Sequence, residues 1–206
     1  MSGTRSASGN GFDHPAVVGI DRATDAAVGR LRGHAGADRV LYGLSQAANH
    51  SLLWHAINLV DAVVGGAAAG SDHARRALRR SVILGVEQAL VNGPIKLAFR
   101  RSRPSTVDDH PHDLRTPSTS SFPSGHASAA ACATVLLARD LGAAPAWAGL
   151  AAAVAWSRVH VGAHHASDVA GGAVLGASLA VAAGRLWPPP GADPGPARYR
   201  GGDVRG

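Results

Sequence analysis

Hydrophobic and polar positions divide the chain into apolar stretches of helical length separated by short polar segments. Five clear stretches cover residues 51–70, 81–99, 126–138, 141–156 and 169–187, and a weaker one covers 40–49. Ala, Val, Leu and Gly carry most of the apolar content, as in tightly packed helices rather than β-sandwiches. The pattern therefore predicts an all-α fold, and the length of 206 residues suits one domain.

The two ends of the chain differ from its middle. Residues 1–15 and 188–206 are rich in Gly, Pro, Ser and Arg without apolar periodicity, which predicts disordered tails. Between Val17 and Leu31 apolar residues recur near helical spacing with Asp and Arg between them. We expect a short amphipathic helix there, lying at a surface without spanning a membrane.

The apolar stretches give two readings, one in a membrane and one in water. Several are shorter than the ~20 apolar residues that a spanning helix needs, and Asp61 and Glu87 interrupt two of them. A soluble enzyme with buried helices is therefore an alternative. Gly172 and Gly176 form a G-x-x-x-G pair, which permits close helix contact in a bilayer. The favoured prediction is a six-helix transmembrane bundle.

The order of the stretches predicts which loops share a side. The loops 100–125 and 157–168 are separated by one helical hairpin, so they emerge on the same face. Positive charge near membrane helices tends to stay in the cytoplasm, which places these loops outside the cell. Six crossings result if the helices before residue 80 cross twice. The opposite, cytoplasmic face would carry Arg75, Arg76, Arg79, Arg80, Arg139, Arg185 and the basic tail.

These observations predict three parts in the chain. A disordered tail with the short amphipathic helix covers 1–35, a helical membrane domain covers 36–187, and a disordered basic tail covers 188–206.

The formal net charge of +6 raises the question of nucleic acid. The arginines are spread over loops and termini, without interleaved aromatic residues or a nucleic-acid-binding motif, so a nucleic-acid partner is not expected. A basic flank facing anionic headgroups, together with a phosphate-binding site, explains the charge better. Cys132 is the single cysteine, which excludes a disulfide framework and a cysteine-based zinc site.

A first group of candidate residues lies in the run KLAFRRSRP, which begins at Lys96 and contains Arg103 and Pro104. Lys96 is the only lysine beside 19 arginines, which suggests that this position needs a compact ammonium group rather than a guanidinium fork. The run fits phosphate binding, and it equally fits a basic flank at a membrane interface. Arg100 and Arg101 are compatible with substrate contact or with headgroup contact.

A second group is Pro123, Ser124, Gly125 and His126, directly before an apolar helix. Such a turn points free backbone N–H groups at one spot, where the helix dipole favours an anion. Alternatively, Ser124 is only an N-cap and His126 only a surface residue.

A third group is Ser157 and Arg158, followed by His164 and Asp168. In a helix, a spacing of four places His164 and Asp168 on one face, where the carboxylate can hold one ring nitrogen and leave the other free to attack. Asp168 as the N-cap of the last helix is the plain alternative. His160 lies four residues before His164, so a metal site is a further alternative that needs a third ligand from elsewhere.

Taken together and in this order, the three groups resemble the signature motifs of the type-2 phosphatidate phosphatase and vanadium haloperoxidase superfamily. The match covers residues 96–168 in identity and spacing, and the surrounding helices agree with the six-helix core of the membrane lipid-phosphatase branch. A triple match is much more specific than any single motif.

The resemblance implies an enzyme that hydrolyses a phosphomonoester or diphosphate of a membrane lipid, either a polyprenyl lipid or phosphatidic acid. By that resemblance His164, oriented by Asp168, attacks phosphorus to give a phosphohistidine, and His126 protonates the leaving group and later activates water. No metal and no cofactor are implied, and the oligomeric state is not predicted. The phosphate-binding residues would be Lys96, Arg103, Ser124, Gly125 and Arg158.

Two alternatives stay open at this point. A vanadate-dependent haloperoxidase would use the same cradle, although those enzymes are larger and soluble. A lipid-phosphate-binding scaffold without turnover is the non-enzymatic alternative, and the presence of His126, His164 and Asp168 speaks against it.

Overall fold

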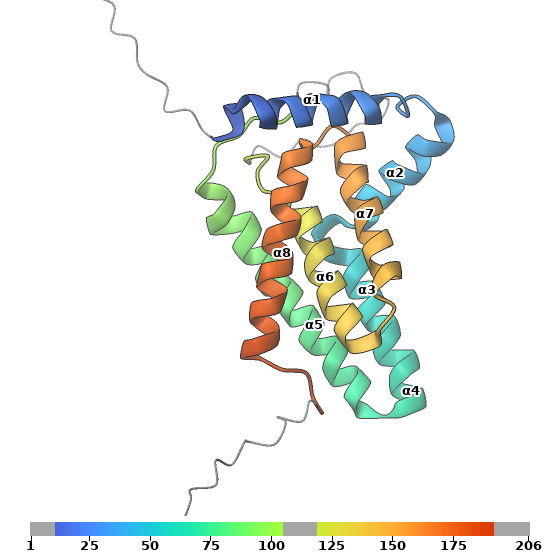
Figure 1. Cartoon of the computed structure of the whole chain (residues 1–206). Coiled ribbons are helices and arrows are strands. Elements are labelled where there is room, and N and C mark those ends of the chain that lie inside the picture. The colour runs from blue at the N-terminus through green and yellow to red at the C-terminus, as the bar shows by residue number, and fades with distance from the viewer. Residues whose placement is uncertain (1–10, 105–118, 192–206) are drawn as a thin grey trace, which may run out of the picture.

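The computed structural model describes residues 11–104 and 119–191, and every regular element within these residues is helical (Figure 1). This confirms the predicted all-α fold class. Short 3-10 turns at Gly11–Asp13 and Asn49–Ser51 and π-helical turns at Asp61–Gly65 and Val91–Ile95 interrupt the helices. The helices are α1 (Pro15–Gly29), α2 (Ala35–Ala47), α3 (Leu52–Val60), α4 (Gly66–Ala69), α5 (Ser71–Leu90), α6 (Gly125–Leu141), α7 (Ala144–His160) and α8 (Ala166–Leu186).

Helix α6 is the centre of the bundle and packs against α5, α7 and α8. Its inner face is built from small residues, so α8 approaches very closely. A Cβ atom at Gly172 would lie 2.4 Å from the carbonyl oxygen of Ser124, and one at Gly176 would lie 1.9 Å from that of Ser128. The G-x-x-x-G pair therefore fixes α8 against the first turn of α6.

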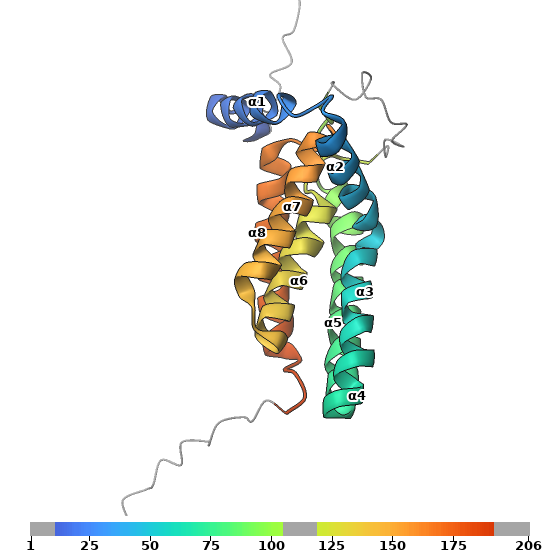
Figure 2. The ribbon, with the colours of Figure 1, turned by 90° about the vertical axis from the view of Figure 1, so that its right-hand side faces the viewer.

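The helices α2, α3 and α4 follow one another along one side of the bundle, with a bend between α2 and α3 (Figure 2). His50 and Ser51 adopt left-handed backbone conformations at the bend, with φ of 51° and 61°. The chain thus turns without reversing its direction, and the predicted double crossing before residue 80 is not seen. The count of six crossings is not confirmed.

Two helical segments are long and apolar enough to cross a membrane, Asn49–Ala68 and Ala166–Leu186. The predicted amphipathic helix corresponds to α1, which lies across one end of the bundle (Figure 1). Most of both predicted disordered tails, residues 1–10 and 192–206, lies outside the described residues.

The sequence suggested that the arginines at the opposite end of the bundle are surface charges. Two of them, Arg79 and Arg80, are instead buried. Arg80 is fully buried and pairs with Asp61 and with Asp140, the latter at 3.0 Å. Its Nε donates to Asn58 Oδ1 at 2.8 Å. Arg79 is also buried and donates to the backbone carbonyl of Trp187 at 2.7 Å. These two arginines therefore tie helices together instead of facing headgroups.

Candidate active site

The two polar loops meet at the end of the bundle that α1 covers. The backbone N–H of Ser121 donates to the carbonyl of Arg101 at 3.0 Å, which joins both sides of the first loop. The ring of His164 in the second loop reaches the carbonyl of Ser121 at 2.7 Å. The prediction that both loops emerge on one face thus agrees with these contacts.

Lys96 lies directly after the π-helical turn that ends the α5 segment and is only 8% exposed. Burial, followed by the nearby charges of Arg103 and Arg158, lowers the pKa of this ammonium group to about 8, while Asp168 opposes the shift. Among residues 11–104 and 119–191 no salt-bridge partner holds Lys96. A compact cation in this position suits an anionic ligand.

Arg103 and Arg158 approach the same place from different elements. Arg103 donates to the carbonyl of Ala163 at 2.7 Å and to that of Thr119 at 3.3 Å, so backbone oxygens orient its fork. Burial lowers the pKa of Arg103, but an arginine stays charged. Arg158 comes from the last turn of α7, is 9% exposed and donates to the Ser45 hydroxyl. Its Nε is buried with no hydrogen-bond partner in the described structure.

The predicted cradle stands at the start of α6. Ser124 is the N-cap, and its hydroxyl accepts from the Ala127 N–H at 3.4 Å. Its own N–H donates to the carbonyl of Asp168 at 3.0 Å, which attaches the cradle to α8. Gly125 opens the helix close to the Asn92 side chain, which would have to move for a larger residue, because a Cβ at position 125 would lie 2.6 Å from Asn92 Oδ1. Ser124 is thus both an N-cap and part of the turn that the anion-binding prediction required.

His126 follows in the first turn of α6 and is half-buried. Its Nε2 lies 3.0 Å from Asn49 Oδ1, at the left-handed bend between α2 and α3. It is electrostatically coupled to Arg158, His164 and Lys96. The second histidine of the predicted pair therefore shares the site with the first.

His164 is 3% exposed, and its Nδ1 lies 2.7 Å from the Ser121 carbonyl oxygen. A carbonyl can only accept, so Nδ1 carries the hydrogen and the neutral ring keeps its lone pair on Nε2. Burial lowers the pKa of His164 to about 4, against the opposing effect of Asp168. Near neutral pH the ring is thus uncharged and Nε2 has the electron pair that a nucleophile needs.

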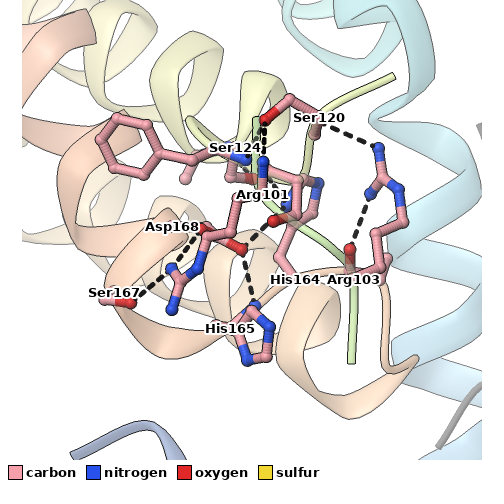
Figure 3. Close-up of polar contacts among 12 residues, drawn as sticks. Arg101, Arg103, Ser120, Ser124, His164, His165, Ser167 and Asp168 are labelled. Carbon is pink, nitrogen blue, oxygen red and sulfur yellow. Dashed lines mark hydrogen bonds and ion pairs between the residues drawn. The ribbon is translucent and has the colours of Figure 1, made fainter. Parts of the chain in front are cut away.

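Asp168 is not the N-cap of α8, because His165 holds that position and Asp168 closes the capping box with its side chain (Figure 3). Its Oδ2 accepts from the His165 N–H at 2.9 Å and lies 3.8 Å from His164 Nδ1. Its Oδ1 accepts from Arg101 at 2.5 Å. Asp168 is therefore a counter-charge near His164, while the hydrogen bond from His164 Nδ1 goes to the Ser121 carbonyl oxygen.

The remaining residues of the third group have structural partners. His160 Nε2 pairs with Asp38 at 2.8 Å, and the Ser157 hydroxyl donates to the Val154 carbonyl at 2.7 Å. Within the part of the chain that the structure describes, no group of three or more His, Cys, Asp or Glu side chains is arranged to hold a metal ion. Among the described residues, the His160–His164 metal alternative therefore has no third ligand.

Sequence reasoning missed several contacts of this site. The Ser121 carbonyl is a backbone group, and Ser45 and Asn49 come from a segment outside the three motifs. For Arg101 the sequence was compatible with contact to the substrate or to headgroups. Arg101 instead joins Asp168 to Asp21 of α1, at 2.7 Å from the latter. Only the Arg101–Asp168 charge complementarity had a signal in the sequence, and nothing in it specified the distance.

Comparison with known proteins supplies the family. The sequence model of the PAP2 superfamily matches residues 77–189, which is more than half of the chain. The chain belongs to the PAP2 superfamily. The family resemblance predicted from the three motifs is thereby confirmed.

Two mycobacterial relatives share one name. A decaprenylphosphoryl-5-phosphoribose phosphatase of Mycobacterium tuberculosis is 34% identical over 150 residues, which cover 66% of this chain and 73% of the relative. A protein of that name from Mycolicibacterium smegmatis is 37% identical over 161 residues, covering 75% and 81%. The predicted enzyme class is confirmed, and this PAP2 protein is a phosphoric ester hydrolase.

The fold also matches a solved PAP2 structure. A transmembrane PAP2-type phosphatidylglycerolphosphate phosphatase from Bacillus subtilis superposes with a TM-score of 0.68 at 23% identity, covering 85% of this chain and 88% of the other. At that identity the match supports the helical architecture.

Proposed function

We propose that this PAP2 protein is an integral membrane phosphatase that hydrolyses a phosphomonoester or diphosphate of a polyprenyl-linked lipid. The observation that carries the proposal is His164, whose Nδ1 is held by a carbonyl while Lys96, Arg103 and Arg158 surround the same place. A neutral imidazole beside three cations suits attack on a phosphate. The names of the mycobacterial relatives favour a polyprenylphosphoryl phosphosugar over phosphatidic acid as the substrate.

In the proposed reaction, Nε2 of His164 attacks phosphorus in line and the bond from phosphorus to the leaving oxygen breaks. The departing alcohol takes a proton from the imidazolium form of His126, which the negative charge of the bound phosphate favours. His126 must exchange Asn49 for this oxygen, since its Nε2 lies 3.0 Å from Asn49 Oδ1. Water then gives a proton to His126 and attacks the phosphohistidine, which releases inorganic phosphate and restores His164.

The phosphate-binding residues stabilise the charge that builds on the equatorial oxygens of the transition state. The side chains of Lys96, Arg103 and Arg158 would act with Ser124 and the N–H of Gly125, at the positive end of the α6 dipole. Three fixed cations perform the electrostatic role that a divalent metal has in other phosphatases. We therefore expect full activity in EDTA.

The orientation in the membrane is also part of the proposal. The site end would face the extracytoplasmic side, because Arg75, whose side chain is 70% exposed, and Arg185 lie toward the other end of the helices. At that interface a lipid phosphate reaches the cations while its tail stays in hydrocarbon. Cysteine labelling from either side of sealed vesicles, with Cys132 replaced, tests this orientation.

The decisive experiment measures phosphate release by detergent-purified protein in EDTA. The panel contains a polyprenylphosphoryl-5-phosphoribose, a polyprenyl diphosphate, phosphatidic acid and a water-soluble phosphomonoester. His164→Ala is compared with wild type, and His55→Ala on α3 serves as the matched histidine control. We expect release from the polyprenyl lipids that His164→Ala abolishes and His55→Ala retains.

Three outcomes contradict the proposal. Loss of activity in EDTA with recovery on adding zinc or magnesium would contradict the metal-free mechanism. Lipid binding without phosphate release would favour the scaffold alternative. Halide oxidation by the protein with vanadate and peroxide, without phosphate release, would favour the haloperoxidase.

A further inference from the structure

Helix α1 lies outside the segment that matches the family model, yet one of its side chains reaches the second loop. Asp21 is 7% exposed, although a carboxylate on a short surface helix normally faces water. Its Oδ1 accepts from the Ser167 N–H at 2.8 Å, and its Oδ2 accepts from the Ser167 hydroxyl at 2.8 Å. Asp21 is thus bound to the residue next to Asp168.

Arg101 connects the Asp21 carboxylate with that of Asp168, and its contact with Asp168 is drawn in Figure 3. One terminal nitrogen of Arg101 donates to Asp21 Oδ2 at 2.7 Å, and the other donates to Asp168 Oδ1 at 2.5 Å. The guanidinium group is 9% exposed and lies over the ring of Phe12 at 4.5 Å. Its charge is therefore shared between two buried carboxylates rather than screened by water.

This sharing affects His164 through Asp168. When His164 takes up phosphorus, its ring becomes positively charged, and the carboxylate 3.8 Å away stabilises that charge. Arg101 opposes this effect because it neutralises the same carboxylate. Asp21 supplies a second negative charge to Arg101 and thus leaves more of the charge on Asp168 available to the ring.

We propose that Asp21 is a positioning residue of the active site, which acts on the His164–Asp168 pair through Arg101. Helix α1 is then a functional part of the site rather than only a surface helix. The inference rests on the proposed phosphohistidine function and adds a residue that lies outside the three motifs.

The cavity beside this contact gives Asp21 a second effect. A cavity of about 400 Å³ separates α1 from the site loops, with Asp21 and Arg22 on one wall and His164 and His165 on the other. The three hydrogen bonds of Asp21 hold α1 over this opening. Without them water would reach the back of the His164–Asp168 pair and weaken its electrostatic coupling.

The test compares Asp21→Asn with Asp25→Asn on the same helix. Asp25 lines the same cavity and pairs with Arg32 at 2.6 Å, but among the described residues no hydrogen bond or ion pair joins it to Arg101 or Asp168, so it controls for the loss of a carboxylate beside the cavity. Phosphohistidine formation is followed in single turnovers, quenched with alkali because the phosphorus–nitrogen bond is acid-labile. We expect Asp21→Asn to lower both this rate and kcat by about 10-fold or more, as for loss of an orienting partner, with KM changed less than about 3-fold.

Asp21→Glu is the second variant, since it keeps the charge and is expected to recover most of the lost rate. Equal kcat in Asp21→Asn and Asp25→Asn would overturn the inference, as would a loss confined to KM or explained by a smaller folded fraction. If Asp21→Asn does not fold, a phosphohistidine rate in Asp21→Glu as low as in Arg101→Gln would overturn it. An inactive wild type, or activity that survives His164→Ala, would instead overturn the proposed function and the inference with it.

Discussion

The two ends of the bundle both bury arginines, but they treat the charge differently. At the α4 end, Arg80 has two carboxylates, Asp61 and Asp140, and a carboxamide. At the α1 end, Arg158 has only the Ser45 hydroxyl among the described residues, and Asp168 already binds Arg101. Arg80 is thus neutralised by two carboxylates, whereas Arg158 has no anionic partner among the described residues, and neither has the buried Arg79, which donates to the Trp187 carbonyl. Burial of an arginine without an anionic partner therefore does not by itself mark a site, and what distinguishes Arg158 is its proximity to His164, Lys96 and Arg103.

The largest expected effect is a loss of activity on substituting Arg158 at the α1 end. Arg158→Ala removes a cation close to His164. We expect kcat/KM to fall about 10²- to 10³-fold, as for the loss of one transition-state donor. Steady-state phosphate release with a saturable lipid substrate in mixed micelles measures it. Wild-type kcat/KM in Arg158→Ala would contradict a role of Arg158 in catalysis.

A substitution of Arg80 at the α4 end is expected to lower the free energy of unfolding rather than the activity. Arg80→Ala leaves the buried side chain of Asp140 without its partner, while Asp61 keeps, among the described residues, only His73 at 3.0 Å. Such a loss costs about 3–5 kcal/mol of folding free energy. Denaturant unfolding in detergent measures this cost, and activity per folded molecule should stay near wild type. Arg75→Ala is the control, because its pair with Asp72 is exposed and 4.0 Å long, and such pairs contribute about 0–1 kcal/mol.

A smaller effect is expected from the packing that joins α8 to α6. Gly176→Ala places a methyl group 1.9 Å from the Ser128 carbonyl oxygen, so α8 has to move. We expect a loss of about 1–3 kcal/mol, typical of overpacking. Gly149→Ala on α7 is the matched control, since nothing lies within 4 Å of its added Cβ. Equal unfolding midpoints for both variants would contradict the close contact.

The smallest expected effect is the pH dependence of kcat/KM that Lys96 causes. The pKa of Lys96 is lowered to about 8, so the free enzyme has the cation below this pH and loses it above. We expect kcat/KM to decline above about pH 8, and Lys96→Arg to move this decline upward, because arginine keeps its charge. The pH profile of kcat/KM between 6 and 10 measures both. An unmoved alkaline limb in Lys96→Arg would assign it to another group.

The sequence predicted the fold class and the proximity of the motifs because both depend on local patterns. Apolar periodicity indicated the helices, and the order of the motifs placed Lys96, Ser124 and His164 at one end. The bend at His50 and Ser51 was not predictable, since a left-handed backbone is uncommon for any residue other than glycine, even for histidine, which adopts it more often than most. An apolar stretch that bends and one that reverses look alike in sequence, so the count of six crossings is not confirmed.

The finer contacts of the site depend on tertiary packing. Spacing of four correctly brought Asp168 near His164, but the 2.7 Å partner of the ring is the Ser121 carbonyl. A backbone oxygen has no signature in sequence. The interpretation of Arg79 and Arg80 as cytoplasmic surface charge was wrong, because long-range carboxylates and carbonyls hold them inside the bundle.

The contact of Gly172 with Ser124 also links two parts of the chemistry mechanically. Helix α8 carries Asp168 in its first turn, and α6 carries the cradle in its own, and backbone touches backbone between them. No rotamer change can absorb a displacement at such a seam. Asp168 and the turn at Ser124 therefore move as one rigid piece, and in the proposed mechanism a lipid substrate has to enter without separating α6 from α8.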